Sequence, residues 1–270
     1  MTVKKHANRN SKKSQQQKGG LSRVDRRRQE REMAGNQEIV DDQKTASENF
    51  KLDWFKPSEE QKEIIHSMCV NDLTLVQGSS GTGKSTTAIF QALSDLKRGS
   101  YQKIYFIKTP SEDGDDMIGF LKGTSSEKLT VHFDAMKSIF HTFMSKAKLE
   151  AEEKAGRIEF SIPNFIAGKT LDHAIVILDE GQKFSPNTMK LLLERAGKDT
   201  RIILLGDKKQ QYAHNKRDDG LTQFVNMITR IDESNKRVSK EPTMGYIELP
   251  ASMNMRSPLS KRIVELYEAE

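Results

Sequence analysis

The sequence has only one cysteine, Cys69, among its 270 residues, which excludes an internal disulfide framework. Cys69 lies among the apolar residues of Ile64–Val70, and this setting predicts a buried thiol in a reducing compartment. No apolar run approaches the ~20 residues that a membrane-spanning helix needs. The N-terminus is polar and basic, without an apolar signal core. These absences predict a soluble cytoplasmic protein that has no membrane contact.

Other signatures of catalytic or metal-binding proteins are also missing. The sequence has no cluster of cysteine and histidine that suggests zinc, no arguable Ser-His-Asp arrangement and no internal repeat. Its length suits one sizeable α/β domain with short extensions. We expect a single catalytic domain over residues 49–270.

Positive charge is concentrated at the N-terminus. Residues 1–50 carry 12 Lys and Arg against 7 Asp and Glu, whereas the rest of the chain carries 32 against 31. Residues 1–48 contain almost no large apolar side chains, so they cannot bury enough surface to offset the entropy of ordering. We predict a disordered basic arm that binds nucleic-acid phosphates or, alternatively, only improves solubility.

The strongest signal in the chain is Gly78-x4-Gly83-Lys84-Ser85, the P-loop pattern. A strand-like apolar run precedes it, and a helical pattern over Ser85–Leu96 follows it. In a P-loop, the backbone N–H groups and the helix N-terminus converge on phosphates, with Lys84 near the β- and γ-phosphates and Ser85 on Mg²⁺. The predicted nucleotide-binding residues are Gly78, Ser79, Ser80, Gly81, Thr82, Gly83, Lys84, Ser85 and Thr86.

Several apolar segments alternate with helical patterns and predict an α/β fold with a mostly parallel central sheet. The expected strands after the P-loop helix are Lys103–Ile107, Arg157–Ile162, Ala174–Leu178, Arg201–Leu205 and Gly245–Leu249. Ligands bind such sheets at the carboxyl ends of the strands.

Asp179 and Glu180 directly follow the strand Ala174–Leu178. At that position, Asp179 can hold the Mg²⁺ shell and Glu180 can orient and deprotonate the attacking water. The alternative is a pair of acids that begins a surface turn, and the presence of a P-loop in the same chain weighs against it.

Gln61 has two interpretations. It stands three residues after Ser58, the spacing of a capping box at a helix start. Its amide can also donate and accept at once, which matches the N6 and N7 edge of adenine. Trp54 or Phe55 could stack on the same base, although packing in the core is the commoner role of such aromatics.

A longer helical pattern covers Val131–Ala151. Its apolar stripe is most simply part of the core, and its two histidines have no partners at metal-binding spacing, so we interpret both as structural. The stripe consists of Phe133, Met136, Phe140 and Phe143, and the histidines are His132 and His141.

Two further polar positions are candidates. Gln210, in Gly206–Gln210 after the strand Arg201–Leu205, has the position of a γ-phosphate sensor, although the spacing alone is a weak match. Arg256, just before a predicted final helix over Pro258–Tyr267, either caps a carbonyl or faces solvent, or it neutralises charge on a transferring phosphoryl group.

Taken together, these motifs resemble the PhoH-like family of P-loop ATPases, which look related to superfamily 1 helicases. The resemblance covers roughly residues 57–270 and extends through Ile118–Gly123 and Arg262–Glu268. It implies a RecA-like fold and the binding of ATP and Mg²⁺. It also implies phosphate and magnesium binding by Lys84 and Ser85, a Walker B pair of Asp179 and Glu180, γ-phosphate sensing by Gln210, adenine recognition by Gln61 and an arginine-finger candidate in Arg256.

The sequence departs from the family pattern at several points. Ser79-Ser80 replaces a common Pro-Ala pair, which should change little because backbone amides bind the phosphates. Lys108-Thr109-Pro110 stands where Thr-Arg-Pro is usual, and lysine cannot reproduce the bidentate geometry of arginine. Longer family members carry a PIN-type nuclease domain before the ATPase, and here the basic arm takes that place, so we expect no nuclease activity.

We therefore expect a magnesium-dependent ATPase that acts on RNA or single-stranded DNA, with helicase activity as one form of that action. The alternative is an ATP-switched scaffold that binds nucleic acid or protein without unwinding. Two-domain helicases complete their site with an arginine from the second domain, so a single-domain chain implies a homo-oligomeric ring, such as a hexamer. The compact form suits a phage-encoded version that works in the host cytoplasm.

Overall fold

The computed structural model describes residues 49–110, 125–207, 219–255 and 257–268. These residues all belong to one compact unit, which spans Thr45–Glu270. The predicted basic arm, the segment Ile118–Gly123, and the candidate residues Gln210 and Arg256 lie outside the described residues.

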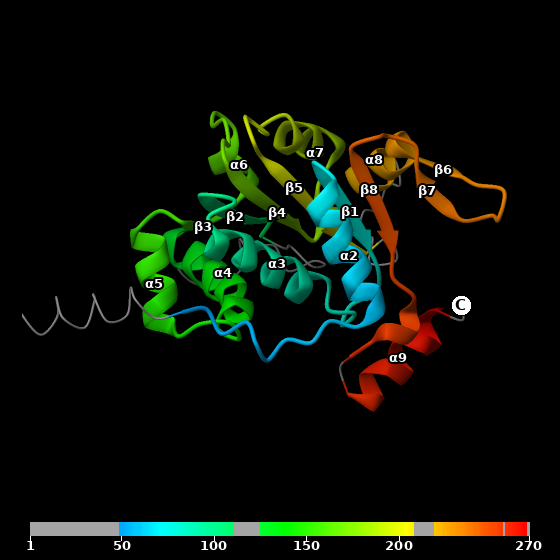
Figure 1. Ribbon diagram of the computed structural model, residues 1–270, viewed down its shortest axis with the longest axis horizontal. Coiled ribbons are helices and arrows are strands. Elements are labelled where there is room, and N and C mark those ends of the chain that lie inside the picture. Colours follow the sequence, from blue (N-terminus) through cyan, green and yellow to red (C-terminus); the bar gives the residue numbers. More distant parts are fainter. Residues whose placement is uncertain (1–48, 111–124, 208–218, 256, 269–270) are drawn as a thin grey trace, which may run out of the picture. The chain divides into compact units, whose positions relative to one another are not determined.

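A parallel sheet forms the centre of this unit (Figure 1). Its six strands, in spatial order, are β3 (Ile158–Ser161), β2 (Lys103–Lys108), β4 (Ala174–Asp179), β5 (Arg201–Gly206), β1 (Leu73–Gln77) and β8 (Met244–Glu248). Every neighbouring pair runs parallel. Strand β5 thus separates the strand that leads into the P-loop from the strand that ends in Asp179, and the predicted RecA-like α/β fold is confirmed.

The central strands are buried on both faces, which explains their continuous apolar sequences. Every residue of β1 and β4 is buried. Side chains alternate between the two faces of a strand, so in β4 Ile175 and Ile177 join one core cluster while Val176 and Leu178 join another. A parallel sheet of this kind requires helices on both faces.

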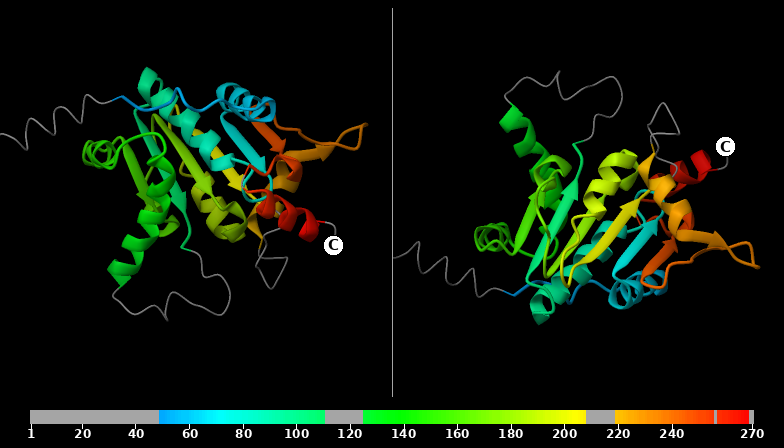
Figure 2. Two further views of the ribbon diagram at one scale, coloured as in Figure 1. Left: turned by 90° about the horizontal axis from the view of Figure 1, so that it is seen from below. Right: turned by 90° about the horizontal axis from the view of Figure 1, so that it is seen from above.

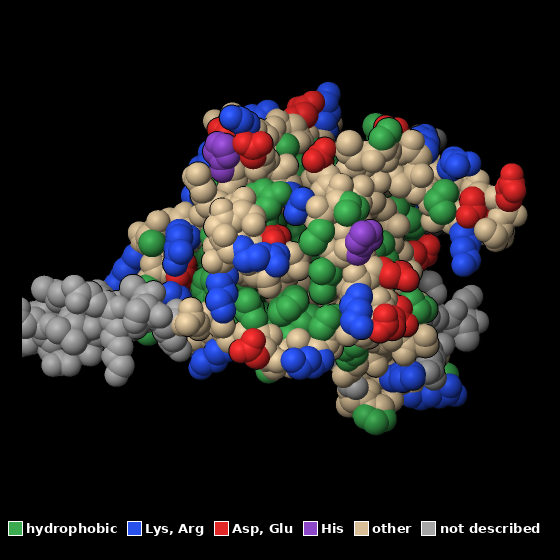
Figure 3. Space-filling model, in the orientation of Figure 1, with side chains coloured by type: hydrophobic (Ala, Val, Ile, Leu, Met, Phe, Trp, Pro, Cys, Tyr) green, Lys and Arg blue, Asp and Glu red, His purple; other side chains and the backbone are tan. Residues whose placement is uncertain are grey.

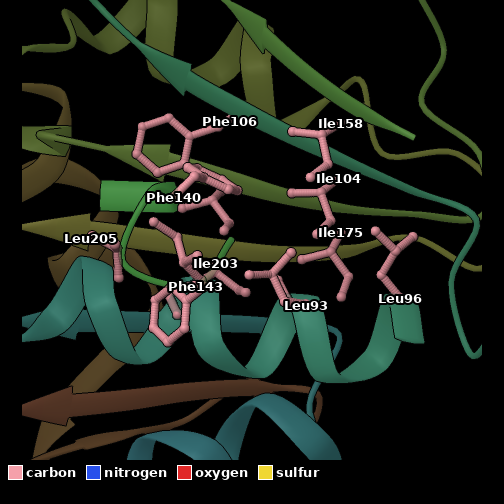
Figure 4. Close-up of a cluster of buried hydrophobic side chains, with 14 of the residues drawn as sticks. Leu93, Leu96, Ile104, Phe106, Phe140, Phe143, Ile158, Ile175, Ile203 and Leu205 are labelled. Atoms are coloured by element: carbon pink, nitrogen blue, oxygen red, sulfur yellow. The ribbon is translucent and has the colours of Figure 1, made fainter. Parts of the chain in front are cut away.

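Helices supply the second half of each core cluster, and Figure 2 shows them on both sides of the sheet. One face is covered by α2 (Glu59–Val70), α3 (Lys84–Arg98), α4 (Ser125–Phe140) and α5 (Lys146–Lys154). The other is covered by α6 (Pro163–Ile166), α7 (Pro186–Leu193) and α8 (Gly220–Ile228). Figure 4 shows Leu93 and Leu96 of α3 pointing toward the strands of the first cluster.

The prediction of one continuous helix over Val131–Ala151 is wrong. Two helices, α4 and α5, replace it, and Ser145 begins the second by accepting a hydrogen bond at Oγ from the backbone N–H of Lys148, at 3.1 Å. The break lets Phe143 turn into the core, where it is fully buried beside Phe140. The prediction that the apolar stripe belongs to the core is confirmed.

The prediction of a buried Cys69 is also wrong, because the thiol is exposed. Helix α2 directs Ile64 and Met68 into the core. The next residue along an α-helix is rotated by about 100°, so Cys69 faces away from that core. The buried neighbours Ile64 and Met68 therefore lie on a different face of the helix from Cys69, whereas the adjacent Val70 is also exposed.

The C-terminal part contains elements that the sequence did not reveal. Strands β6 (Thr229–Ile231) and β7 (Arg237–Ser239) form an antiparallel hairpin, and each is too short to show an alternating pattern. The predicted final helix is present as α9 (Pro258–Glu268). Among the described residues, no helix is long and apolar enough to cross a membrane.

Candidate functional site

The P-loop connects β1 to α3 at the carboxyl end of the sheet. Gly81 and Gly83 have φ of 84° and 79°, the left-handed region that favours glycine. Gly83 is also the N-cap of α3 and provides no side-chain cap, which leaves the first N–H groups of the helix for another partner. Lys84 Nζ donates to the backbone oxygens of Gly78 and Ser79, the latter at 2.8 Å.

The segment that follows β8 donates hydrogen bonds to backbone oxygens of the P-loop and of the end of β1. The backbone N–H of Met255 donates to the oxygen of Gly81 at 2.9 Å, and Asn254 Nδ2 donates to the oxygen of Ser80 at 3.3 Å. The N–H of Leu249 donates to the oxygen of Gln77 at 2.8 Å. Backbone carbonyls of the loop thus accept hydrogen bonds from a segment more than 150 residues later in the sequence. No local sequence motif predicts this contact.

Ser85 and Asp179 meet at the end of β4. Ser85 Oγ donates to Asp179 Oδ1 at 3.1 Å. Burial raises the pKa of the Asp179 carboxyl, Lys108 opposes this rise, and the neighbouring charge of Glu180 adds to it. A serine hydroxyl and a carboxylate are the oxygen donors that suit Mg²⁺, so the residues fit the ion that the sequence predicts.

Glu180 has an unusual backbone conformation, with φ 58° and ψ 45°, which is uncommon for a residue other than glycine. Its carboxylate is held from two sides. Lys108 Nζ lies 3.4 Å from Oε1, and Gln182 Nε2 donates to Oε2 at 2.7 Å. The side chain is therefore fixed in place beside Asp179 and Ser85.

Gln182 links two strands of the site. Besides its bond to Glu180, its Oε1 accepts from the backbone N–H of Asp207 at 3.0 Å. Asp207 directly follows β5 and is buried. No pattern in the sequence predicts a role for Gln182, because only the left-handed turn at Glu180 brings its amide close to both Glu180 and Asp207.

Lys108 belongs to the same group of residues at the end of the sheet. It is the last residue of β2 and is paired in register with Asp179 of β4. Its ammonium lies 4.0 Å from Asp179 Oδ2. The backbone oxygen of Lys108 lies 3.3 Å from His132 Nε2, so α4 contacts the same strand end.

Gln61 forms the predicted capping box of α2. Its Oε1 accepts from the N–H of Ser58 at 3.0 Å, and its own N–H donates to Ser58 Oγ at 3.3 Å. The amide nitrogen points toward the P-loop: a Cβ atom on Gly83 would lie 2.6 Å from Nε2. The cap is confirmed, and it also fixes which side of the amide faces the loop.

These groups line one pocket of about 520 Å³. Its polar lining includes Gln61, Ser80, Lys84, Ser85, Thr86, Lys108, Asp179, Glu180, Gln182 and Asp207, and its apolar side chains are Trp54, Phe55, Ile139 and Met255. Of the predicted loop residues, Gly78, Ser79 and Thr82 support the loop without lining the pocket. Gln210 and Arg256 lie outside the described residues, so their roles stay predictions.

Among solved structures, the chain is similar to the ATPase domain of the large terminase of a Thermus phage. The TM-score is 0.47 at 16% sequence identity, and the match covers 80% of this chain and 88% of that one.

Curated relatives match most of this chain. A PhoH-like protein of Bacillus subtilis is 31% identical over 210 residues, which are 78% of this chain and 62% of that protein. A PhoH-like protein of Synechocystis is 27% identical over 208 residues, 77% of this chain and 60% of that protein. The chain thus spans about three fifths of the length of these relatives. The family model for PhoH-like proteins matches residues 56–268, and the chain therefore belongs to the PhoH-like family.

Proposed function

We propose that this chain binds ATP with Mg²⁺, hydrolyses it, and couples hydrolysis to an action on nucleic acid. The observation that carries the proposal is the meeting of Ser85 and Asp179 at 3.1 Å, with Glu180 adjacent, beside the P-loop lysine. The arrangement combines a phosphate-binding loop, two oxygen donors for a metal and a carboxylate that can accept a proton.

Binding begins at the N-terminus of α3. The N–H groups there and the positive end of the helix dipole attract the phosphates. Lys84 exchanges its bonds to the oxygens of Gly78 and Ser79 for bonds to the β- and γ-phosphates. Because those carbonyls already bind an ammonium group, Lys84 is held close to its functional position before the nucleotide arrives.

Ser85 and Asp179 would hold Mg²⁺ through their oxygen atoms. The ion supplies positive charge that neutralises the β- and γ-phosphate oxygens. Burial raises the pKa of the Asp179 carboxyl, and a bound cation would offset the cost of burying its charge.

Glu180 is the proposed general base. It orients a water molecule in line with the γ-phosphorus and accepts its proton. The new bond joins the water oxygen to phosphorus as the bond to the β–γ bridging oxygen breaks, giving ADP and phosphate. Gln182 and Lys108 position the carboxylate for this step.

Gln61 is the proposed reader of adenine. Because Oε1 accepts from Ser58, Nε2 is the donor on the pocket side, and it would exchange its 3.6 Å contact with Met255 Sδ for N7 of a purine. The second lone pair of Oε1 can accept from N6 of adenine, whereas guanine presents an acceptor at that position.

The action on nucleic acid is supported by the basic composition of residues 1–48 and by the family's resemblance to helicases. An RNA or single-stranded DNA helicase is the form we test first. The alternative is a scaffold that ATP switches between binding states without unwinding.

The test is steady-state ATP hydrolysis with Mg²⁺, with and without single-stranded RNA or DNA, beside a strand-displacement assay. We expect Glu180→Gln to lower kcat by about 10²-fold or more while ATP still binds. Glu194→Gln, on the exposed end of α7, is the matched control. Wild-type kcat in Glu180→Gln would refute the mechanism. Stimulation without strand displacement would select the scaffold, and indifference to nucleic acid would refute both forms.

We further propose a homo-oligomer, such as a hexameric ring, in which Arg256 of one subunit reaches the nucleotide of the next. Support comes from α9, whose side chains Leu259, Ile263 and Leu266 recur at helical spacing and are all exposed. Figure 3 shows apolar side chains at the surface over this helix. The helix follows Met255, which lines the pocket.

Mixing two inactive variants tests the shared site. Lys84→Ala chains keep Arg256, and Arg256→Ala chains keep Lys84, so a mixture contains some complete sites. We expect partial recovery of hydrolysis in the mixture. A monomer by light scattering together with no recovery would contradict the proposal.

A further inference from the structure

Trp54 is the single tryptophan of the chain, and it is 51% exposed. Large aromatic side chains usually bury most of their surface. Trp54 instead lines the pocket that contains Lys84 and Gln61. The segment before α2 thus presents an open indole ring to the proposed nucleotide site.

The ring is firmly supported from the core side. It stacks on Phe143, with the ring centroids 5.2 Å apart and an interplanar angle of 30°. Phe55 meets it edge-on at 5.6 Å and 81°. Phe143 is fully buried. Phe55 in turn packs on Phe90 of α3, with the two ring centroids 4.7 Å apart. This support keeps the exposed part of the indole in a defined orientation.

The remaining lining of the pocket limits where a nucleoside can lie. Asp179, Glu180 and Asp207 present carboxylates, which suit the metal and the reacting water but not a planar base. The apolar lining is confined to Trp54, Phe55, Ile139 and Met255. A base whose edge meets Gln61 therefore finds its apolar surface on these side chains.

From this arrangement we propose that Trp54 is the stacking platform for the base of the bound nucleotide. The inference rests on the proposed function and specifies its substrate class: the pocket takes nucleoside triphosphates in preference to inorganic polyphosphates. Stacking on an aromatic face is tolerant of base identity, so Trp54 contributes affinity, while Gln61 contributes the choice of adenine.

Because Trp54 is the only tryptophan, its fluorescence reports on the platform directly. We expect ATP to quench the emission of the wild-type protein and inorganic tripolyphosphate to leave it unchanged. By calorimetry, Trp54→Ala should weaken ATP binding on the order of 10-fold and leave tripolyphosphate binding unchanged. Trp54→Phe should retain most of the affinity. Phe165→Ala, at an exposed aromatic residue of α6 outside the pocket, is the matched control.

The outcomes distinguish failure of the stacking role of Trp54 from failure of the proposed ATP binding. ATP that binds by calorimetry without changing Trp54 emission, and with equal affinity in Trp54→Ala, would overturn the platform alone. Equal losses of ATP and tripolyphosphate binding in Trp54→Ala would also overturn it, since they would indicate a general structural defect. Absence of ATP binding in the wild-type protein would overturn the proposed function and the platform with it.

Discussion

Lys108 Nζ lies 3.4 Å from Glu180 Oε1, so the last residue of β2 restrains the carboxylate that follows β4. The two strands are direct neighbours, with Lys108 opposite Asp179. The positive charge also opposes the rise in the pKa of Asp179 that burial causes. Lys108 thus acts on both acids of the site.

The first prediction concerns removal of this charge. Lys108→Ala should lower kcat for ATP hydrolysis by about tenfold or more, because charged hydrogen bonds contribute about 1.5–3 kcal/mol. Lys108→Arg keeps the charge and should retain more of the rate. The control is Lys103→Ala, at the opposite end of β2, where Lys103 pairs with Glu159 at 2.7 Å. Steady-state kinetics that show equal kcat in Lys108→Ala and Lys103→Ala would contradict the role.

The fold and the centre of the site could be predicted because their signals are local. The P-loop is continuous in sequence, and Asp179 and Glu180 directly follow a strand whose apolar run marks it as buried. The parallel sheet then brings both strand ends together. Ser85 and Asp179 meet for this reason although 94 residues separate them.

The remaining contacts depend on tertiary structure. The bond from Gln182 to the N–H of Asp207 requires the left-handed turn at Glu180, which a non-glycine residue rarely adopts. Asn254 and Met255 support the P-loop through hydrogen bonds to Ser80 and Gly81, and in the sequence the two segments are separated by most of the domain. Cys69 is exposed because another face of α2 packs against the sheet. A short apolar run in the sequence does not show which face of the helix is buried.

A second prediction tests Gln182. Gln182→Ala removes the donor to Glu180 and leaves the buried N–H of Asp207 without that partner. We expect kcat to fall by about tenfold while ATP affinity is retained, since the phosphate-binding loop is untouched. Gln102→Ala, at an exposed position before β2, is the control. A loss of ATP binding that matches the loss of kcat would show that Gln182 supports the whole site rather than Glu180.

A third prediction concerns acid sensitivity at His132. Burial lowers the pKa of this ring, and the nearby charges of Lys108 and Lys183 lower it further. The unfolded chain therefore gains its proton at a higher pH than the folded chain, and stability is lost as the pH falls through the ordinary histidine range. Urea denaturation from about pH 7.5 to about pH 5.5 should show a smaller loss in His132→Gln than in the wild type. His66→Gln, at an exposed position of α2, should behave like the wild type; identical pH slopes in all three would contradict the assignment.

The fourth prediction separates backbone strain from contact at Gly83. Ala at this position must adopt φ near 79°, and its Cβ would lie 2.6 Å from Gln61 Nε2. The strain, about 1–2 kcal/mol, should lower Tm by a few degrees, and displacement of Gln61 should weaken ATP binding. Gly99→Ala is the matched control, because Gly99 ends the same helix with φ of 74° and has nothing within 4 Å of the added Cβ. It should share the loss of Tm and keep wild-type ATP affinity. Equal ATP affinity in the two variants, measured by calorimetry, would show that the position of Gln61 does not affect nucleotide binding.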